Sequence, residues 1–227
     1  RKRGDSAVRP SVSGWSAGLS APVPDSALSA AIARCVVADA RAGRFAAWGT
    51  STVVDEFVGE AVVSEGVATA LHRLARVPVR FPVGNAGVLH VYGYWFATRP
   101  TPFGYKRDRW LDGRLARAFG LPATAFIPRA DPVSTPLQRV LEVAMPVLDE
   151  PRQALATADA EVDGVLTRVC LVRATGADAT ALVYGVAGAD GMRLVTTFPV
   201  GGDALELIDD FVEHPRWRWN AARVAES

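Results

Sequence analysis

The sequence predicts an α+β fold in which an antiparallel sheet, formed by a C-terminal meander, is flanked by helices. Three β-rich runs, at 162–174, 180–187 and 192–200, are separated by short turns that contain Gly and Asp, a pattern typical of adjacent antiparallel strands. A helical pattern follows them at 205–212. Because the strands succeed one another directly instead of alternating with helices, a parallel, doubly wound sheet is disfavoured.

The N-terminal part of the chain carries helical patterns. A first helix is predicted between an N-cap at Asp25 or Ser26 and a stop at Gly43. Its apolar face comprises Leu28, Ile32, Cys35, Val36 and Ala40. A second amphipathic helix is predicted within 64–76, whereas 50–63 fits both helical and strand periodicity.

The middle of the chain changes its period. The runs 77–83 and 88–97 alternate or are continuously apolar, and a Pro82, Gly84-Asn85 turn separates them, so two strands are predicted. Helical spacing returns at 111–119, which Gly120 ends, and at 135–148.

Domain organisation follows from length and composition. Residues 1–24 are rich in Pro, Ser and Gly and are expected to form an extended N-terminal arm. The remaining residues, 25–227, are expected to form a single α+β domain, within which 25–76 can build a helical lobe. With 49% hydrophobic and 22% charged residues, the composition is that of a globular protein, and its wealth of Ala, Val, Arg and Gly is typical of a high-GC bacterial genome.

Net charge and cysteine use exclude several functional classes. The 25 basic and 24 acidic residues leave a formal charge of +1, so no overall field attracts the chain to nucleic acid or to a membrane surface. No apolar run reaches the ~20 residues of a membrane-spanning helix. Cys35 and Cys170 stand apart in apolar surroundings, which predicts free thiols and a cytoplasmic protein. We expect neither a metal nor a cofactor, because metal-ligand spacings and nucleotide-binding fingerprints are missing from the sequence.

The best candidate site is an aromatic run, 89–96, followed by a loop crowded with cations, 98–110. Arg groups bind carboxylates and phosphates through paired donors, and Tyr and Trp rings can wall a pocket for a planar molecule. We predict His90 and Tyr105 as catalytic residues, because an imidazole titrates near neutrality and a phenol donates a hydrogen bond. The predicted substrate-binding residues are Tyr92, Tyr94, Arg99, Lys106, Arg107, Arg109 and Trp110.

Two other segments invite functional interpretations that their context weakens. The stretch 14–18 reads Gly-Trp-Ser-Ala-Gly and matches a nucleophile elbow, but no strand precedes it and no helix follows it. The stretch 216–219 reads Arg-Trp-Arg-Trp, and on a strand its rings would face the core while its guanidinium groups reached water.

These observations favour a cofactor-independent enzyme, a hydrolase, lyase or isomerase, that acts by acid/base chemistry on a small anionic, aromatic or conjugated molecule. One alternative is an RNA-binding or RNA-cleaving protein that uses the basic loop and 216–219, although the near-neutral charge makes nucleic acid a disfavoured partner. Another is a non-catalytic module that binds a ligand or a partner protein. The sequence alone does not decide whether the protein is an enzyme or whether it forms a homodimer.

Overall fold

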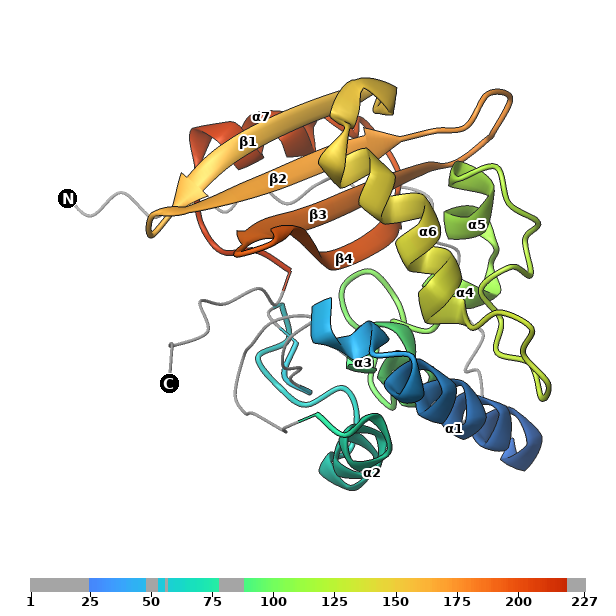
Figure 1. Cartoon of the computed structure of the whole chain (residues 1–227). Helices are drawn as coiled ribbons and strands as arrows, with labels where there is room; N and C mark the ends of the chain where they lie inside the picture. The colour runs from blue at the N-terminus through green and yellow to red at the C-terminus, as the bar shows by residue number, and fades with distance from the viewer. Residues whose placement is uncertain (1–24, 48–52, 56, 78–87, 220–227) are drawn as a thin grey trace.

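The computed structural model describes residues 25–47, 53–55, 57–77 and 88–219 (Figure 1). Within them the fold is α+β, with seven α-helices and one four-stranded antiparallel sheet, as predicted. The arm expected at 1–24, the Gly-Trp-Ser-Ala-Gly stretch inside it and nearly all of the strand expected at 77–83 lie outside the described residues. No helix in the described part of the chain is long and apolar enough to span a bilayer.

The sheet is a meander with the order β1-β2-β3-β4 (Figure 1). Its strands are β1 (Ala156–Val162), β2 (Val165–Val172), β3 (Thr180–Gly188) and β4 (Gly191–Val200). A two-residue turn, Asp163-Gly164, joins β1 to β2, and both residues have positive φ, as the tightest hairpin turns require. The sequence did not predict β1, because its inward positions hold Ala and its outward positions hold Thr, Asp and Glu, which leaves little apolar alternation at this edge of the sheet.

Side-chain hydroxyl and carboxylate groups cap the longer helices. In α1 (Ser26–Arg41) the Asp25 carboxylate accepts from the Leu28 amide, and in α2 (Glu65–Ala75) Ser64 has the same role. Thr135 caps α6 (Pro136–Asp149), which continues past Pro146 to its last turn. These three helices confirm the sequence-based prediction, and α7 (Leu205–Glu213) confirms the helix expected after the sheet.

The segment 88–97 corrects the prediction of a strand. It forms α3 (Val88–Val91) and the 3-10 helix η2 (Gly93–Phe96), followed by Ala97. All residues from Val88 to Trp95 are buried, so the run has no exposed face whose period could separate strand from helix, and its aromatic content misled the prediction.

Two further expectations are corrected. The helix expected at 111–119 is divided into α4 (Asp108–Leu111) and α5 (Arg114–Ala118), because Gly113 adopts positive φ between them. The stretch 216–219 is not a strand, and Arg218 is buried whereas Trp217 is partly exposed.

Helices cover both faces of the sheet. A Cβ at Gly185 would meet Leu148 of α6, whereas the ring of the preceding Tyr184 packs on Phe211 of α7. Since neighbouring residues of a strand point to opposite faces, α6 and α7 lie on opposite sides of the sheet, as Figure 1 also shows. The α1, α2 and α3 helices lie beyond β4, and one continuous cluster of buried apolar side chains joins them to the sheet.

Candidate functional site

The candidate site lies at the edge strand β4, where His90 of α3 bonds to the backbone of Val195 and Arg109 of α4 lies over the ring of Phe198. His90 of α3 is 5% exposed and its imidazole is hydrogen-bonded to the backbone of Val195. Val195 is the extra residue of a β-bulge, because Thr196 pairs with Tyr184 and Leu194 pairs with Gly185. A bulge removes one residue from the ladder and re-aims the chain, and bulges are over-represented next to active sites. Here it offers a backbone partner to the buried imidazole.

The Tyr94 ring is the centre of the cluster. Its centroid lies 5.2 Å from that of the His90 ring. Lys106 Nζ lies 4.7 Å and Arg109 Cζ 5.2 Å from the same centroid, and Arg109 also lies 6.0 Å from the ring of Phe198 in β4. These are cation–π distances, which favour the charged forms beside the rings. One tyrosine thus brings an imidazole and two cations together.

The two cations differ in their counter-charges. Lys106 Nζ forms an ion pair of 2.5 Å with Asp55 Oδ2, and the Asp55 side chain is fully buried. The other oxygen of Asp55 accepts hydrogen bonds from the amides of Phe57 and Val58. Arg109 donates from Nε to the Lys106 carbonyl, and no ion pair within the described residues includes it. Arg109 is therefore the cation of the two that lacks an ion pair, and its side chain is partly buried. Burial lowers the pKa of Arg109, and the nearby Tyr94 and Asp55 partly offset this effect.

The environment keeps His90 neutral. Burial lowers the pKa of the imidazole well below its usual range, and the charges of Lys106 and Arg109 lower it further. The hydrogen bond to Val195 acts in the opposite direction without cancelling these effects. A neutral imidazole has one donor and one acceptor nitrogen, so His90 is in the protonation state of a base at neutral pH.

Hydrogen-bond donors on three rings are buried in this part of the chain. Tyr94 Oη, Trp95 Nε1 and Trp110 Nε1 have no hydrogen-bond partner among the residues that the structure describes. Buried polar groups normally find partners, so each such atom calls for an explanation. An indole nitrogen only donates, and a phenol readily donates, so an acceptor oxygen would suit all three.

Of the residues predicted from the sequence, four come together here, namely His90, Tyr94, Lys106 and Arg109. The other five have different surroundings. Arg99 is exposed and pairs with Glu60, and Trp110 packs edge-on against Phe126. Arg107 donates to the Ala97 carbonyl and stacks on the Tyr105 ring, and Tyr92 belongs to a separate network.

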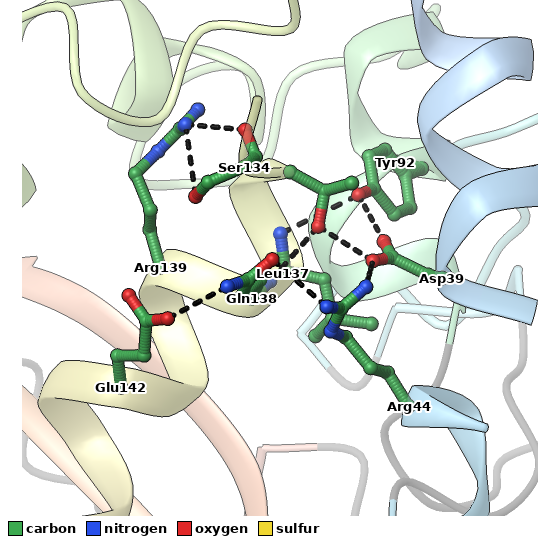
Figure 2. A network of polar contacts seen from close by, with 9 residues as sticks. Asp39, Arg44, Tyr92, Ser134, Leu137, Gln138, Arg139 and Glu142 are labelled. Atoms are coloured by element: carbon green, nitrogen blue, oxygen red, sulfur yellow. Dashed lines mark hydrogen bonds and ion pairs between the residues drawn. The ribbon is translucent and has the colours of Figure 1, made fainter. Parts of the chain in front are cut away.

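Figure 2 shows that separate network, which joins α1, the residue after α3 and the start of α6. The buried Asp39 carboxylate accepts hydrogen bonds from Tyr92 Oη, from Thr135 Oγ1 and, at 3.0 Å, from Arg44. The Leu137 amide donates to Tyr92 Oη at 3.4 Å. Burial raises the pKa of Asp39, although the three donors partly offset this effect. Because Tyr92 lies between His90 and Tyr94 in the chain, the network holds the segment that carries both.

Sequence reasoning missed Asp39, Asp55 and Phe198. Asp39 takes the next position on the apolar face of α1 after Ile32, Cys35 and Val36, and Asp55 directly follows two valines. A carboxylate at such a position is expected to be buried, and a buried carboxylate needs a polar partner. Comparisons with protein-family models, curated proteins and solved structures found no match, which leaves the chemistry of these side chains as the guide to function. The described residues contain no group of three or more His, Cys, Asp or Glu side chains placed to hold a metal ion.

Proposed function

We propose that the protein is a cofactor-independent enzyme that binds a small anionic molecule, aromatic or conjugated, at Arg109 and moves a proton with His90. One observation carries the proposal. The Arg109 side chain, which is partly buried and forms no ion pair with a carboxylate among the described residues, shares the Tyr94 ring with a neutral, buried imidazole. Titratable groups whose pKa values are shifted by burial and by nearby charges are typical of functional sites.

Each group has a distinct chemical task in this proposal. The Arg109 guanidinium holds a carboxylate or phosphate through parallel N–H donors. The Tyr94 hydroxyl donates to a second oxygen of the substrate, which supplies the acceptor that this phenol lacks within the protein. His90 accepts a proton from the substrate or from a water molecule. The bound anion offsets the charges of Lys106 and Arg109, so the pKa of His90 rises as the substrate arrives and the imidazole becomes a better base.

Anion binding to an Arg109→Gln variant tests the proposal. Charge-assisted hydrogen bonds contribute about 1.5–3 kcal/mol, so we expect Arg109→Gln to weaken the binding of benzoate about 10- to 100-fold in isothermal titration calorimetry. Arg152→Gln is the matched control, because Arg152 is 86% exposed in η3 (Pro151–Gln153) and pairs with Glu150 outside the site. The proposal is contradicted if the two variants bind benzoate with equal affinity. It is also contradicted if the unaltered protein binds neither benzoate nor phenyl phosphate measurably.

The alternatives predict different results. RNA binding was expected to use 216–219, but Trp217 Nε1 donates to Asp163 and Arg218 is held by Asp210, so these donors already have partners within the protein. That alternative now depends on the basic loop alone, and affinity for single-stranded RNA that falls steeply with salt would favour it. A non-catalytic module would bind benzoate with the same dependence on Arg109 and would turn over none of the anions it binds.

A further inference from the structure

The C-terminal segment 215–219 lies across the face of the sheet that α7 also covers. The Trp219 ring packs at 4.8 Å from the ring of Tyr184 in β3 and at 5.6 Å from the ring of Phe198 in β4. Phe198 is also the β4 residue whose ring meets Arg109. The indole of Trp219 is therefore separated from the guanidinium of the candidate site by a single aromatic ring.

Hydrogen bonds from two side chains hold this segment in place, and its last residue has a strained backbone conformation. Trp217 Nε1 donates to Asp163 Oδ2 at 2.8 Å, in the turn between β1 and β2. Arg218 donates to Asp210 Oδ2 at 2.6 Å and to the carbonyls of Asp210 and His214. Trp219 itself has a φ of +52°, a left-handed conformation that bulky residues rarely adopt. Such strain persists where the surrounding structure holds it and is concentrated at ligand-binding positions.

Exposure separates the two parts of the site. His90 and Tyr94 are buried, whereas Arg109, Phe198 and Trp219 are each only partly buried. One cation and two partly buried rings thus lie in contact with one another, next to the buried base. Aromatic rings pair in offset or edge-on geometry, so the accessible parts of Phe198 and Trp219 can receive a planar ring whose anionic group is bound by Arg109.

We propose that Trp219 is a specificity-determining residue of this site. With Phe198 it forms the apolar wall that selects aromatic carboxylates over non-planar carboxylates of similar size. The inference rests on the proposed function, since it takes Arg109 as the anion-binding group. It goes further by narrowing the ligand class to aromatic carboxylates and by naming the C-terminal residue that selects them.

The chain offers a matched control for this residue. Trp217 is an indole in the same segment, two residues away, but its ring nitrogen is bound to the turn at Asp163. The probes are benzoate and cyclohexanecarboxylate, which have the same charge and nearly the same size but differ in planarity. The measurement is the ratio of their dissociation constants for the full chain, from isothermal titration calorimetry.

We expect the unaltered protein to prefer benzoate and Trp219→Ala to reduce this preference about tenfold, mainly through weaker benzoate binding, as the loss of one aromatic contact implies. Trp217→Ala should keep the preference. Trp219→Phe, which retains a ring, should keep most of it, and Trp219→Leu, which retains apolar bulk, should lose it. The Phe and Leu variants provide the same test if Trp219→Ala fails to fold.

The contrary outcomes are distinct. An unchanged preference in Trp219→Leu or Trp219→Ala, while both carboxylates still bind through Arg109, overturns the role of Trp219 and leaves the anion site in place. A loss that is equal for the two carboxylates, or equal in the Trp217 and Trp219 variants, also overturns it, because such a loss reports a structural role. If the unaltered protein binds neither carboxylate, the proposed function itself fails.

Discussion

Removing the Tyr92 hydroxyl tests whether the buried network of Figure 2 holds the segment that carries His90. The hydroxyl donates to the fully buried Asp39 carboxylate and accepts from the Leu137 amide at 3.4 Å. A hydrogen bond to a charged group contributes about 1.5–3 kcal/mol, and leaving a buried amide without its acceptor costs about 1 kcal/mol more. We therefore expect Tyr92→Phe to lower the free energy of unfolding by about 2.5–4 kcal/mol. At about 2–4 °C per kcal/mol for a chain of this size, the midpoint of thermal unfolding should fall by about 5–16 °C.

Urea unfolding and differential scanning calorimetry measure this effect, with Tyr105→Phe as the matched control. Tyr105 is partly exposed, and its hydroxyl makes no hydrogen bond in the described structure, so its loss should change the free energy of unfolding by less than about 0.5 kcal/mol. Equal stabilities of the two variants would refute the reasoning, because the network would then contribute nothing beyond the packing of the ring.

The remaining predictions concern protonation and packing. The His90 imidazole should titrate well below 6.5 in NMR spectra, and Lys106→Met should raise its pKa, because a cation leaves and the partner carboxylate loses its counter-charge. The folded state binds the His90 proton more weakly than the unfolded state does. The stabilising contribution of the neutral imidazole is therefore present above pH 6.5 and is lost as the pH falls toward the pKa of the folded state. An NMR titration midpoint of His90 at or above 6.5 would contradict this prediction. Gly185→Ala should cost about 1–3 kcal/mol in urea unfolding, since the new Cβ would lie 2.8 Å from Leu148 Cδ1, whereas Gly66→Ala in α2 has open space and should gain about 0.5–1 kcal/mol. Comparable effects of the two glycine substitutions would show that α6 yields to the added methyl.

Part of the candidate site was predictable because its residues are close in sequence. Lys106 lies in the turn just before α4 and Arg109 in its first turn, three residues later, so their proximity follows from local geometry. That His90 would join them depended on α3 folding back against β4, and the sequence offers no local signal for that contact. The predicted roles of Arg99, Arg107 and Tyr105 rested on the same loop. The structure gives these three side chains other neighbours, because a loop distributes its side chains in all directions.

The sequence alone determined the elements whose signals are local. Asp25, Ser64 and Thr135 cap helices with their own side chains, and short turns rich in Gly and Asp separate the strands of the meander, so these features need no distant partner.

Only the tertiary structure decided the form of 88–97 and the burial of Asp39. An apolar run that is buried all round has no period to distinguish strand from helix. A carboxylate can be buried only where donors meet it, and those of Asp39 come largely from Tyr92 and Thr135, 53 and 96 residues away. Hydrogen bonds over such separations form when the chain packs, and this packing also places His90 beside Arg109.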